Sequence, residues 1–111
     1  GVTGTNDTNV VLVFGLRGNV YRSEDIGDTW ERIEVATESS MLSAAVNKFE
    51  KITLVGTAGS VLLSNDGGRT FTETIRGNRL GNASAIYVQS SHVVMVGEAG
   101  INITDPSGTN L

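Results

Sequence analysis

Two stretches of the sequence decide the fold: residues 21–33 read YRSEDIGDTWERI, and residues 62–74 read LLSNDGGRTFTET. Both contain the pattern Ser-x-Asp-x-Gly-x-Thr-aromatic, and the second copy follows the first after 41 residues. The members of the pattern are Ser23, Asp25, Gly27, Thr29 and Trp30 in the first copy and Ser64, Asp66, Gly68, Thr70 and Phe71 in the second. A polar octet that occurs twice indicates a repeat, and the rest of the chain should follow the same period.

Pairs of glycines carry this period of 41 residues along the whole chain. The first members are Gly15, Gly56 and Gly97, and the second members are Gly18, Gly59 and Gly100. Each pair follows an apolar run rich in β-branched residues, at 10–14, 52–55 and 93–96, which is typical of a strand buried on both faces. The third copy ends in DPSGTNL, in which Asp105 and Ser107 exchange the serine and the aspartate of the octet.

A period of this length without a helical signal predicts the four-stranded blades of a β-propeller. We expect innermost strands at 41–46 and 84–88, second strands at the three apolar runs, third strands at 19–23 and 60–64, and outermost strands at 29–35 and 70–75. The predicted fold class is therefore all-β, a β-propeller fragment of about two and a half four-stranded antiparallel blades. Residues 1–111 form a single partial domain with blades at about 10–35, 41–76 and 82–111; the first blade lacks its innermost strand and the last its outermost.

The residue types of the octet predict a structural brace. Aspartate accepts hydrogen bonds from backbone N–H groups, serine and threonine bind nearby main chain, and glycine takes backbone angles that other residues resist. The aromatic residue should anchor the loop between neighbouring sheets. A calcium loop is a poor alternative, because Asp28 of the first copy is replaced by Arg69 in the second. We predict no metal, no cofactor and no catalytic residue in the octet.

The octet resembles the Asp-box, or BNR repeat, of β-propellers in sialidases, other glycoside hydrolases, sorting receptors and the photosystem II assembly/stability factors. The longer pattern Gly-x-x-Gly-x-x-x-x-Ser-x-Asp-x-Gly-x-Thr-aromatic is most similar to the last of these families and its bacterial relatives, and it covers residues 10–104. In such families the Asp-box is structural and lies away from the active face. The resemblance implies an exported protein, in the periplasm, a lumen or the extracellular space, that assists the assembly or stability of a membrane complex.

Candidate binding residues are three arginines outside the octets. In an up-and-down blade, the turns between the second and third strands share one face with the connections between blades, and the Asp-boxes lie on the other face. We expect Arg17, Arg76 and Arg79 on the face opposite the boxes, together with Glu38 and Glu98. Guanidinium groups suit carboxylates and phosphates, so the arginines are candidates for ligand binding. The alternative is that they are solvated loop residues paired with acids.

Composition excludes several classes of protein. The 111 residues carry a formal net charge of −4, which argues against a general nucleic-acid binder. The sequence has no cysteine, so disulfides and thiolate metal sites are excluded. No apolar run approaches the ~20 residues that a membrane-spanning helix needs, and we recognise no signal peptide in this sequence.

Three hypotheses about function follow. The first is a non-enzymatic scaffold that binds a protein or peptide on the arginine-bearing face. The second is a fragment of a sialidase-like or other Asp-box glycoside hydrolase, although Glu38, Glu50 and Glu98 lie in no recognisable catalytic motif. The third concerns assembly, because about two and a half blades leave unpaired end strands and cannot close a ring. The chain would then be a fragment of a longer propeller, or copies would self-associate to complete a ring.

Overall fold

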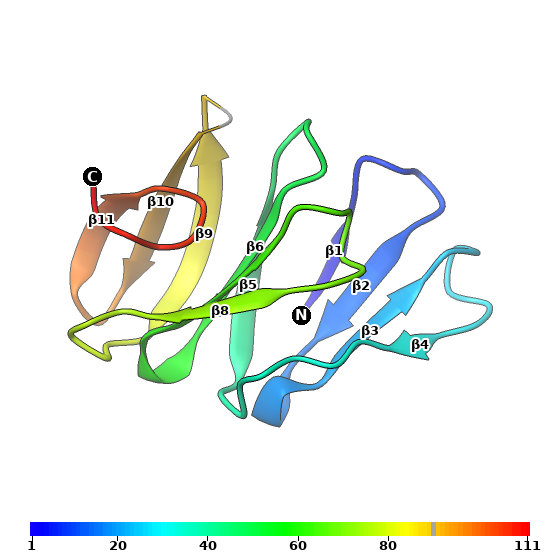
Figure 1. Cartoon of the computed structure of the whole chain (residues 1–111), viewed down its shortest axis with the longest axis horizontal. Coiled ribbons are helices and arrows are strands. Elements are labelled where there is room, and N and C mark those ends of the chain that lie inside the picture. The colour runs from blue at the N-terminus through cyan, green and yellow to red at the C-terminus, as the bar shows by residue number, and fades with distance from the viewer. Residues whose placement is uncertain (90) are drawn as a thin grey trace.

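The computed structural model describes residues 1–89 and 91–111, which form three antiparallel β-sheets arranged side by side (Figure 1). Sheet 1 contains β1 (Val2–Gly4), β2 (Val11–Phe14), β3 (Val20–Ser23) and β4 (Glu31–Arg32). Sheet 2 contains β5 (Met41–Val46), β6 (Ile52–Gly56), β7 (Ser60–Ser64) and β8 (Thr72–Ile75). Sheet 3 contains β9 (Asn82–Val88), β10 (His92–Gly97) and β11 (Gly100–Thr104). Strands that follow one another within a sheet are hydrogen-bonded neighbours, which is the up-and-down order predicted for blades.

Sheet 1 has four strands, so the prediction that the first blade lacks its innermost strand is wrong. Val2 lies opposite Val13 and Gly4 lies opposite Val11, and the amino group of Gly1 donates to the carbonyl oxygen of Phe14 at 2.5 Å. Three residues are too few to give a periodic signal in the sequence. In the part of the chain that the structure describes, sheet 3 has three strands and no outermost strand, as predicted, with an isolated bridge between Thr104 and Asn110 at that position.

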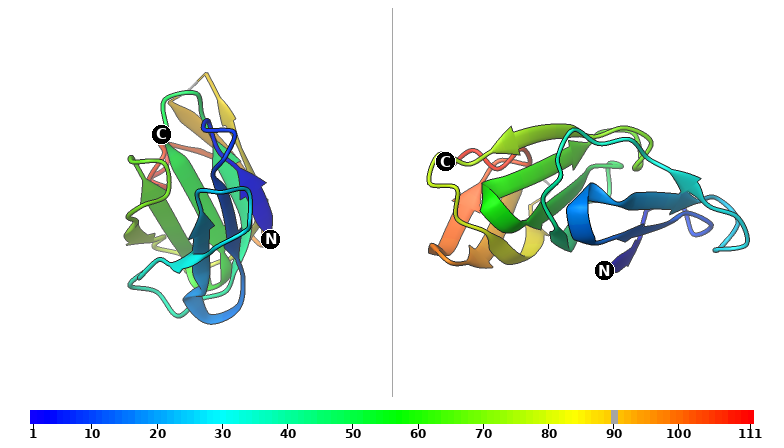
Figure 2. Two further views of the ribbon diagram at one scale, coloured as in Figure 1. Left: turned by 90° about the vertical axis from the view of Figure 1, so that its right-hand side faces the viewer. Right: turned by 90° about the horizontal axis from the view of Figure 1, so that it is seen from below.

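Sheet 2 lies between the other two sheets, and this position explains the burial of β6, in which all five residues are buried (Figure 2). Ile52 and Leu54 belong to a core with residues of sheet 1, whereas Val55 belongs to a second core with residues of sheet 3. In β2 buried residues alternate with half-buried ones, because one face of sheet 1 has no neighbour. The three apolar runs look alike in the sequence, but only the central one is buried on both faces.

The first two glycine turns are built alike. The 3₁₀ turns η1 (Leu16–Gly18) and η2 (Thr57–Gly59) each end in a glycine with a positive φ, +71° in the first and +75° in the second. The glycine that precedes η2 has another role, because Gly56 has an extended φ of −165° that any residue adopts. A β-carbon at Gly56 would lie 1.9 Å from the carbonyl oxygen of Ser40. This glycine is needed where the connection between two sheets passes close to the strand.

The third glycine turn is a tighter hairpin, in which its two glycines lie directly opposite each other. In sheet 2, Val55 is opposite Val61, whereas the equivalent Val96 of sheet 3 is opposite Ile101, one residue closer along the chain. A shift of one residue turns every side chain of a strand to the other face. The sequence spacing of the glycines is the same in all three copies, so this change of register was not predictable from the repeat.

The shifted register decides which side chains of β11 face solvent. Asn102 lies opposite the buried Met95, on the side of sheet 2. Ile101 and Ile103 point to the other side and are 75% and 54% exposed. Sheet 3 therefore presents isoleucines on its open face.

Within the described part of the chain, no helix is long and apolar enough to cross a membrane.

Candidate functional site

Hydrogen bonds within the loop hold the first Asp-box in shape. The Ser23 hydroxyl accepts the N–H of Gly27 at 2.7 Å and donates to Oδ1 of Asp25 at 2.7 Å. The Asp25 carboxylate also accepts the backbone N–H of Thr29 at 2.8 Å and the Thr29 hydroxyl at 2.5 Å. The same four bonds recur in the second box, among Ser64, Asp66, Gly68 and Thr70. Both aspartates thus point at donors of their own loops, as predicted. The threonine differs from the prediction, because its hydroxyl donates to the aspartate carboxylate and not to nearby main chain.

These bonds keep both carboxylates ionised. Donation by the Thr29 hydroxyl and N–H lowers the pKa of Asp25 from 3.8 to about 2. Burial by itself would raise the pKa of Asp66, but donation by Thr70 and Ser64 outweighs it and lowers that pKa to about 2 as well. Carboxylates already supplied with donors in this way have little capacity left for a ligand.

The incomplete third box keeps part of this network. Oδ1 of Asp105 accepts the N–H groups of Ser107 at 2.9 Å and Thr109 at 3.0 Å, which lie two and four residues further along the chain. In the first box the Ser23 hydroxyl accepts the N–H groups at the same two spacings. The Ser107 hydroxyl donates to the same carboxylate oxygen at 2.7 Å. Burial would raise the pKa of Asp105, but these hydrogen bonds outweigh it and lower that pKa. The exchange of serine and aspartate therefore preserves the start of the loop.

The second box docks on sheet 1, whereas the first box docks on no other sheet among the described residues and is tied to the loop before β2, by the Ile26 N–H that donates to the carbonyl oxygen of Asn9 at 3.0 Å. Phe71 packs against the core shared by sheets 1 and 2, and a β-carbon at Gly68 would lie 2.9 Å from Cδ1 of the buried Leu12. Trp30, at the position of Phe71 in the repeat, is 43% exposed. The expectation that Trp30 anchors its loop between sheets is not met, because in the described chain no sheet lies on that side of sheet 1.

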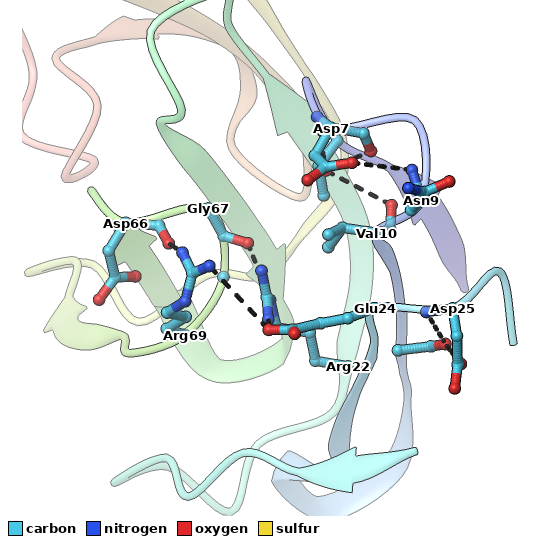
Figure 3. Close-up of polar contacts among 12 residues, drawn as sticks. Asp7, Asn9, Val10, Arg22, Glu24, Asp25, Asp66, Gly67 and Arg69 are labelled. Atoms are coloured by element: carbon cyan, nitrogen blue, oxygen red, sulfur yellow. Dashed lines mark hydrogen bonds and ion pairs between the residues drawn. The ribbon is translucent and has the colours of Figure 1, made fainter. Parts of the chain in front are cut away.

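Arg22 fastens the second box to sheet 1 (Figure 3). This buried side chain donates from Nε to the carbonyl oxygen of Gly67 at 3.1 Å and pairs with Glu24, whose carboxylate lies 4.0 Å from Arg69. Sequence reasoning missed this residue. The signal for it is the position of Arg22 in the repeat, which corresponds to Leu63 of sheet 2: an arginine replaces an apolar residue inside a predicted strand.

Arg76, one of the three predicted binding residues, fastens the third box to sheet 2 in the same way. It is buried, donates to the carbonyl oxygen of Gly108 at 2.7 Å and donates to Oδ1 of Asn110 at 2.8 Å. A cavity of about 370 Å³ opens beside it, between the end of β8 and residues 108–110. The structure gives the Arg76 guanidinium partners within the chain, and a ligand-binding role for it stays a prediction.

Arg17 in η1 and Arg79 in the connection from β8 to β9 are exposed, at turns on the face opposite the boxes. Both have a left-handed backbone, with φ of +56° and +54°. The backbone at Arg79 passes close to Gly59, where an added β-carbon would lie 2.8 Å from the Arg79 Cα, and the Arg79 N–H donates to the carbonyl oxygen of Arg76 at 2.9 Å. Among residues 1–89 and 91–111, neither guanidinium has a hydrogen bond or ion pair. Within the described residues, Arg79 thus joins a hydrogen-bonded backbone to an unpaired cation.

A cavity of about 390 Å³ opens on this face between sheets 1 and 2. Its polar lining comes from Thr37, Glu38, Ser39, Ser60, Glu73 and Arg79. The hydroxyls of Thr37 and Ser60 are 3.0 Å apart, and the Ser60 hydroxyl donates to Glu73 at 2.6 Å. One cation, two carboxylates and three hydroxyls suit a polar chain with both donors and acceptors better than they suit a simple anion.

The structure separates the other acidic candidates. Glu98 accepts the backbone N–H of Gly81 at 2.9 Å and so closes the connection into sheet 3. Glu50 lies in the hairpin turn between β5 and β6, on the side of the boxes. Of the glutamates considered from the sequence, only Glu38 lines the cavity beside Arg79. In the residues that the structure describes, no group of three or more histidine, aspartate or glutamate side chains could hold a metal ion.

The three sheets match solved structures of YCF48. YCF48 from Cyanidioschyzon merolae matches with a TM-score of 0.83 over 98% of this chain, at 21% sequence identity. A structure of YCF48 bound to D1 peptide matches with a TM-score of 0.82 over 99% of this chain, at 19% identity. The fold is that of a β-propeller segment. This confirms the predicted fold class, and the chain spans only 37% of each YCF48 chain.

YCF48 is a photosystem II assembly factor, so the match agrees with the family resemblance of the Asp-box repeat. No protein-family model matches the sequence, and no curated protein matches it significantly.

Proposed function

We propose that this chain is a non-enzymatic propeller module that binds a protein or peptide segment on the face opposite the Asp-boxes. The observation that carries the proposal is the structural match, over nearly the whole chain, to YCF48 with a bound D1 peptide. The low identity transfers no contact residue, so the binding face is argued from this chain alone.

The two faces differ in what they offer a ligand. On the box face, Asp25 and Asp66 each accept three hydrogen bonds from donors of their own loops. On the opposite face, Arg79 has an unpaired guanidinium at the edge of a cavity whose lining also includes Glu73 and Ser60. A peptide supplies carbonyl or carboxylate oxygens for the arginine and N–H groups for the glutamate, so both signs of charge in the cavity find partners.

The family resemblance extends the proposal to location and role. It supports an exported protein that assists the assembly or stability of a membrane complex. Fractionation of cells that express the native gene tests the location: recovery outside the cytoplasm is expected, and recovery only in the cytoplasm would contradict this part of the proposal.

Peptide binding is tested by fluorescence anisotropy with a labelled D1 peptide and with peptides selected from a random displayed library. Replacement of Arg79 by Glu should weaken binding at least ~10-fold, because it reverses the charge of a charge-assisted contact. The matched control is Arg69→Glu, which reverses an exposed arginine on the box face and should leave binding unchanged. Failure of the D1 peptide and of the library to bind, or a larger loss in Arg69→Glu, would contradict the proposal.

A second candidate function rests on one observation: Glu38 and Glu73 both line the cavity beside Arg79. Two carboxylates on one cavity are the minimum set for glycoside hydrolysis. Hydrolysis of a fluorogenic sialoside or aryl glycoside distinguishes the two functions. Turnover by the wild-type chain that is lost in Glu73→Gln would favour the hydrolase, and turnover equal to buffer supports the binding module.

A further inference from the structure

The outer edge of sheet 2 is a strand with backbone groups that turn away from the sheet. The strands of this sheet follow the order β5-β6-β7-β8, so β8 has a neighbouring strand on one side only (Figure 1). Directly after β8, the Arg76 N–H donates to the carbonyl oxygen of Gly59 at 2.8 Å. Backbone bonds between two antiparallel strands fall on every second residue, so Thr74 also turns its N–H and carbonyl groups toward β7. Glu73 and Ile75, on either side of Thr74, turn theirs outward.

This edge is open to an extended chain. In the part of the chain that the structure describes, no hydrogen bond reaches the outward N–H and carbonyl groups of Glu73 and Ile75. Residues 72–75 contain no proline and no lysine, and β8 pairs with β7 in one continuous register. Sheet 2 has the four strands of a complete blade, with sheets 1 and 3 on its two sides. An unpaired edge of this kind is a template for another strand.

The cavity that contains Arg79 lies along this edge. Ile75 is opposite Ser60 and Glu73 is two residues before Ile75, so both side chains point to the side of sheet 2 that faces sheet 1. Both residues line the cavity of about 390 Å³. A strand added beyond β8 would turn every second side chain to the same side. Main-chain bonds would then hold the segment, and the cavity would select its alternate side chains.

The charged groups of the cavity differ along the strand. The Glu73 carboxylate accepts the Ser60 hydroxyl at 2.6 Å, and among residues 1–89 and 91–111 neither Glu73 nor Glu38 has an ion pair. The unpaired guanidinium of Arg79 belongs to the turn that follows β8, and the half-exposed Ile75 ends the strand between these charges. A segment with a basic side chain opposite Glu73, an apolar one opposite Ile75 and an acidic one nearest Arg79 would match each group.

We propose that β8 binds an extended peptide segment as a fifth strand of sheet 2, a step that rests on the peptide binding of the proposed function. Alternate basic, apolar and acidic side chains of the segment occupy the cavity beside Arg79. The outward groups of Glu73 and Ile75 supply two donors and two acceptors for its main chain. Backbone bonds give such a segment its affinity, and the cavity gives it selectivity.

Amide hydrogen exchange followed by NMR tests the proposal within a single strand. The probe is the labelled D1 peptide or a library peptide, whichever binds in the anisotropy measurement. On binding, the N–H groups of Glu73 and Ile75 should exchange at least ~10-fold more slowly, because each gains a hydrogen-bond acceptor. The N–H of Thr74 is the control in the same strand: it is already turned to β7, so its exchange should slow less than theirs.

A pair of variants at one residue separates the main-chain bond from the side chain. Ile75→Pro removes an outward N–H and no bond to β7, whereas Ile75→Ala loses the same side chain and keeps the N–H. Ile75→Pro should weaken peptide binding about 5-fold more than Ile75→Ala does. Circular dichroism melting checks folding. If Ile75→Pro unfolds, peptides methylated at alternate backbone nitrogens replace it: one set of alternate positions should lose binding and the other should keep it.

Three results would overturn the proposal. Peptide binding that leaves the exchange of Glu73 and Ile75 unchanged, or that weakens equally in the two variants, would overturn it and leave the proposed function standing. Protection of these N–H groups that rises with protein concentration in the absence of peptide would mean that the edge pairs with a second copy of the chain. If no peptide binds at all, the proposed function fails, and strand addition fails with it.

Discussion

The two complete Asp-boxes have the same internal hydrogen bonds but lie in different surroundings. In each, the aspartate accepts bonds from a threonine four residues on and from the serine two residues before it. The second box packs Phe71 against a core, whereas Trp30 of the first is half-exposed. The polar residues therefore fix the shape of the loop wherever it occurs. The aromatic residue and the glycine contribute to stability only where another sheet lies against them.

The largest difference in stability between the boxes is expected on substitution of the glycine of each octet, Gly27 or Gly68. Both glycines have a φ of +94°. Alanine is strained at either position, at a cost of about 1–2 kcal/mol. At Gly68 the new β-carbon would also meet the buried Leu12 at 2.9 Å, so Gly68→Ala should lose about 3 kcal/mol or more of the free energy of unfolding. Urea denaturation of both variants measures this, and equal losses would contradict the docking difference.

The aromatic residues should show the next largest difference. Phe71→Ala removes a partly buried ring from the core between sheets 1 and 2 and should cost about 2 kcal/mol. Trp30→Ala removes a larger but half-exposed ring and should cost under about 1 kcal/mol in the monomer, measured by the same denaturation at low protein concentration. A greater loss of the free energy of unfolding in Trp30→Ala than in Phe71→Ala would contradict the half-exposed position of Trp30.

Arg22 tests whether the second box is fastened by a hydrogen bond as well as by packing. Arg22→Leu introduces the residue that the repeat has at position 63 and leaves the buried carbonyl of Gly67 without its donor. We expect a loss of about 1–2 kcal/mol. Glu24→Gln is the control, since its exposed carboxylate should contribute at most about 0.5 kcal/mol. If Glu24→Gln lost as much free energy of unfolding as Arg22→Leu, the stabilisation would come from the ion pair between Arg22 and Glu24.

Acid should remove a smaller contribution from both boxes. A carboxylate with a lowered pKa stabilises the fold fully above its unfolded value, here 3.8, and loses that contribution as the pH falls through about 2. The free energy of unfolding should therefore fall between pH 3.8 and about 2. Asp66→Asn should be less stable at neutral pH, and its free energy of unfolding should change less with pH between 3.8 and about 2. Asp28→Asn, which alters a side chain outside the hydrogen bonds of the boxes, should keep the pH dependence of the wild type.

The sequence predicted what is local. The order of strands, the polar network of the octets and the turn glycines depend on residues close together in the chain, and Ser23 with Asp25 is a clear example. The sequence could not predict β1, because the three residues Val2–Gly4 are too few to show an alternating pattern of apolar and polar residues. Nor could it predict the hairpin register at Gly97, because two turn types share one glycine spacing.

The candidate site was predicted only as a face. Connectivity places Arg17, Arg76 and Arg79 at the same edge of the sheets, but it does not determine where a long side chain points. Arg76 turns into the contact between sheets 2 and 3, and only Arg79 lines the cavity that the links between sheets create. That cavity depends on packing between sheets, for which a single sequence carries no direct signal.

The central claim is that the Asp-box aspartates brace their own loops and leave ligand binding to the other face. Carboxyl ¹³C NMR titration of Asp25 and Asp66, with and without calcium and a bound peptide, tests it most directly. The account predicts a pKa of about 2 for both, unchanged by either addition. A pKa near 3.8, or a carboxyl resonance that moves when calcium or peptide is added, would contradict it.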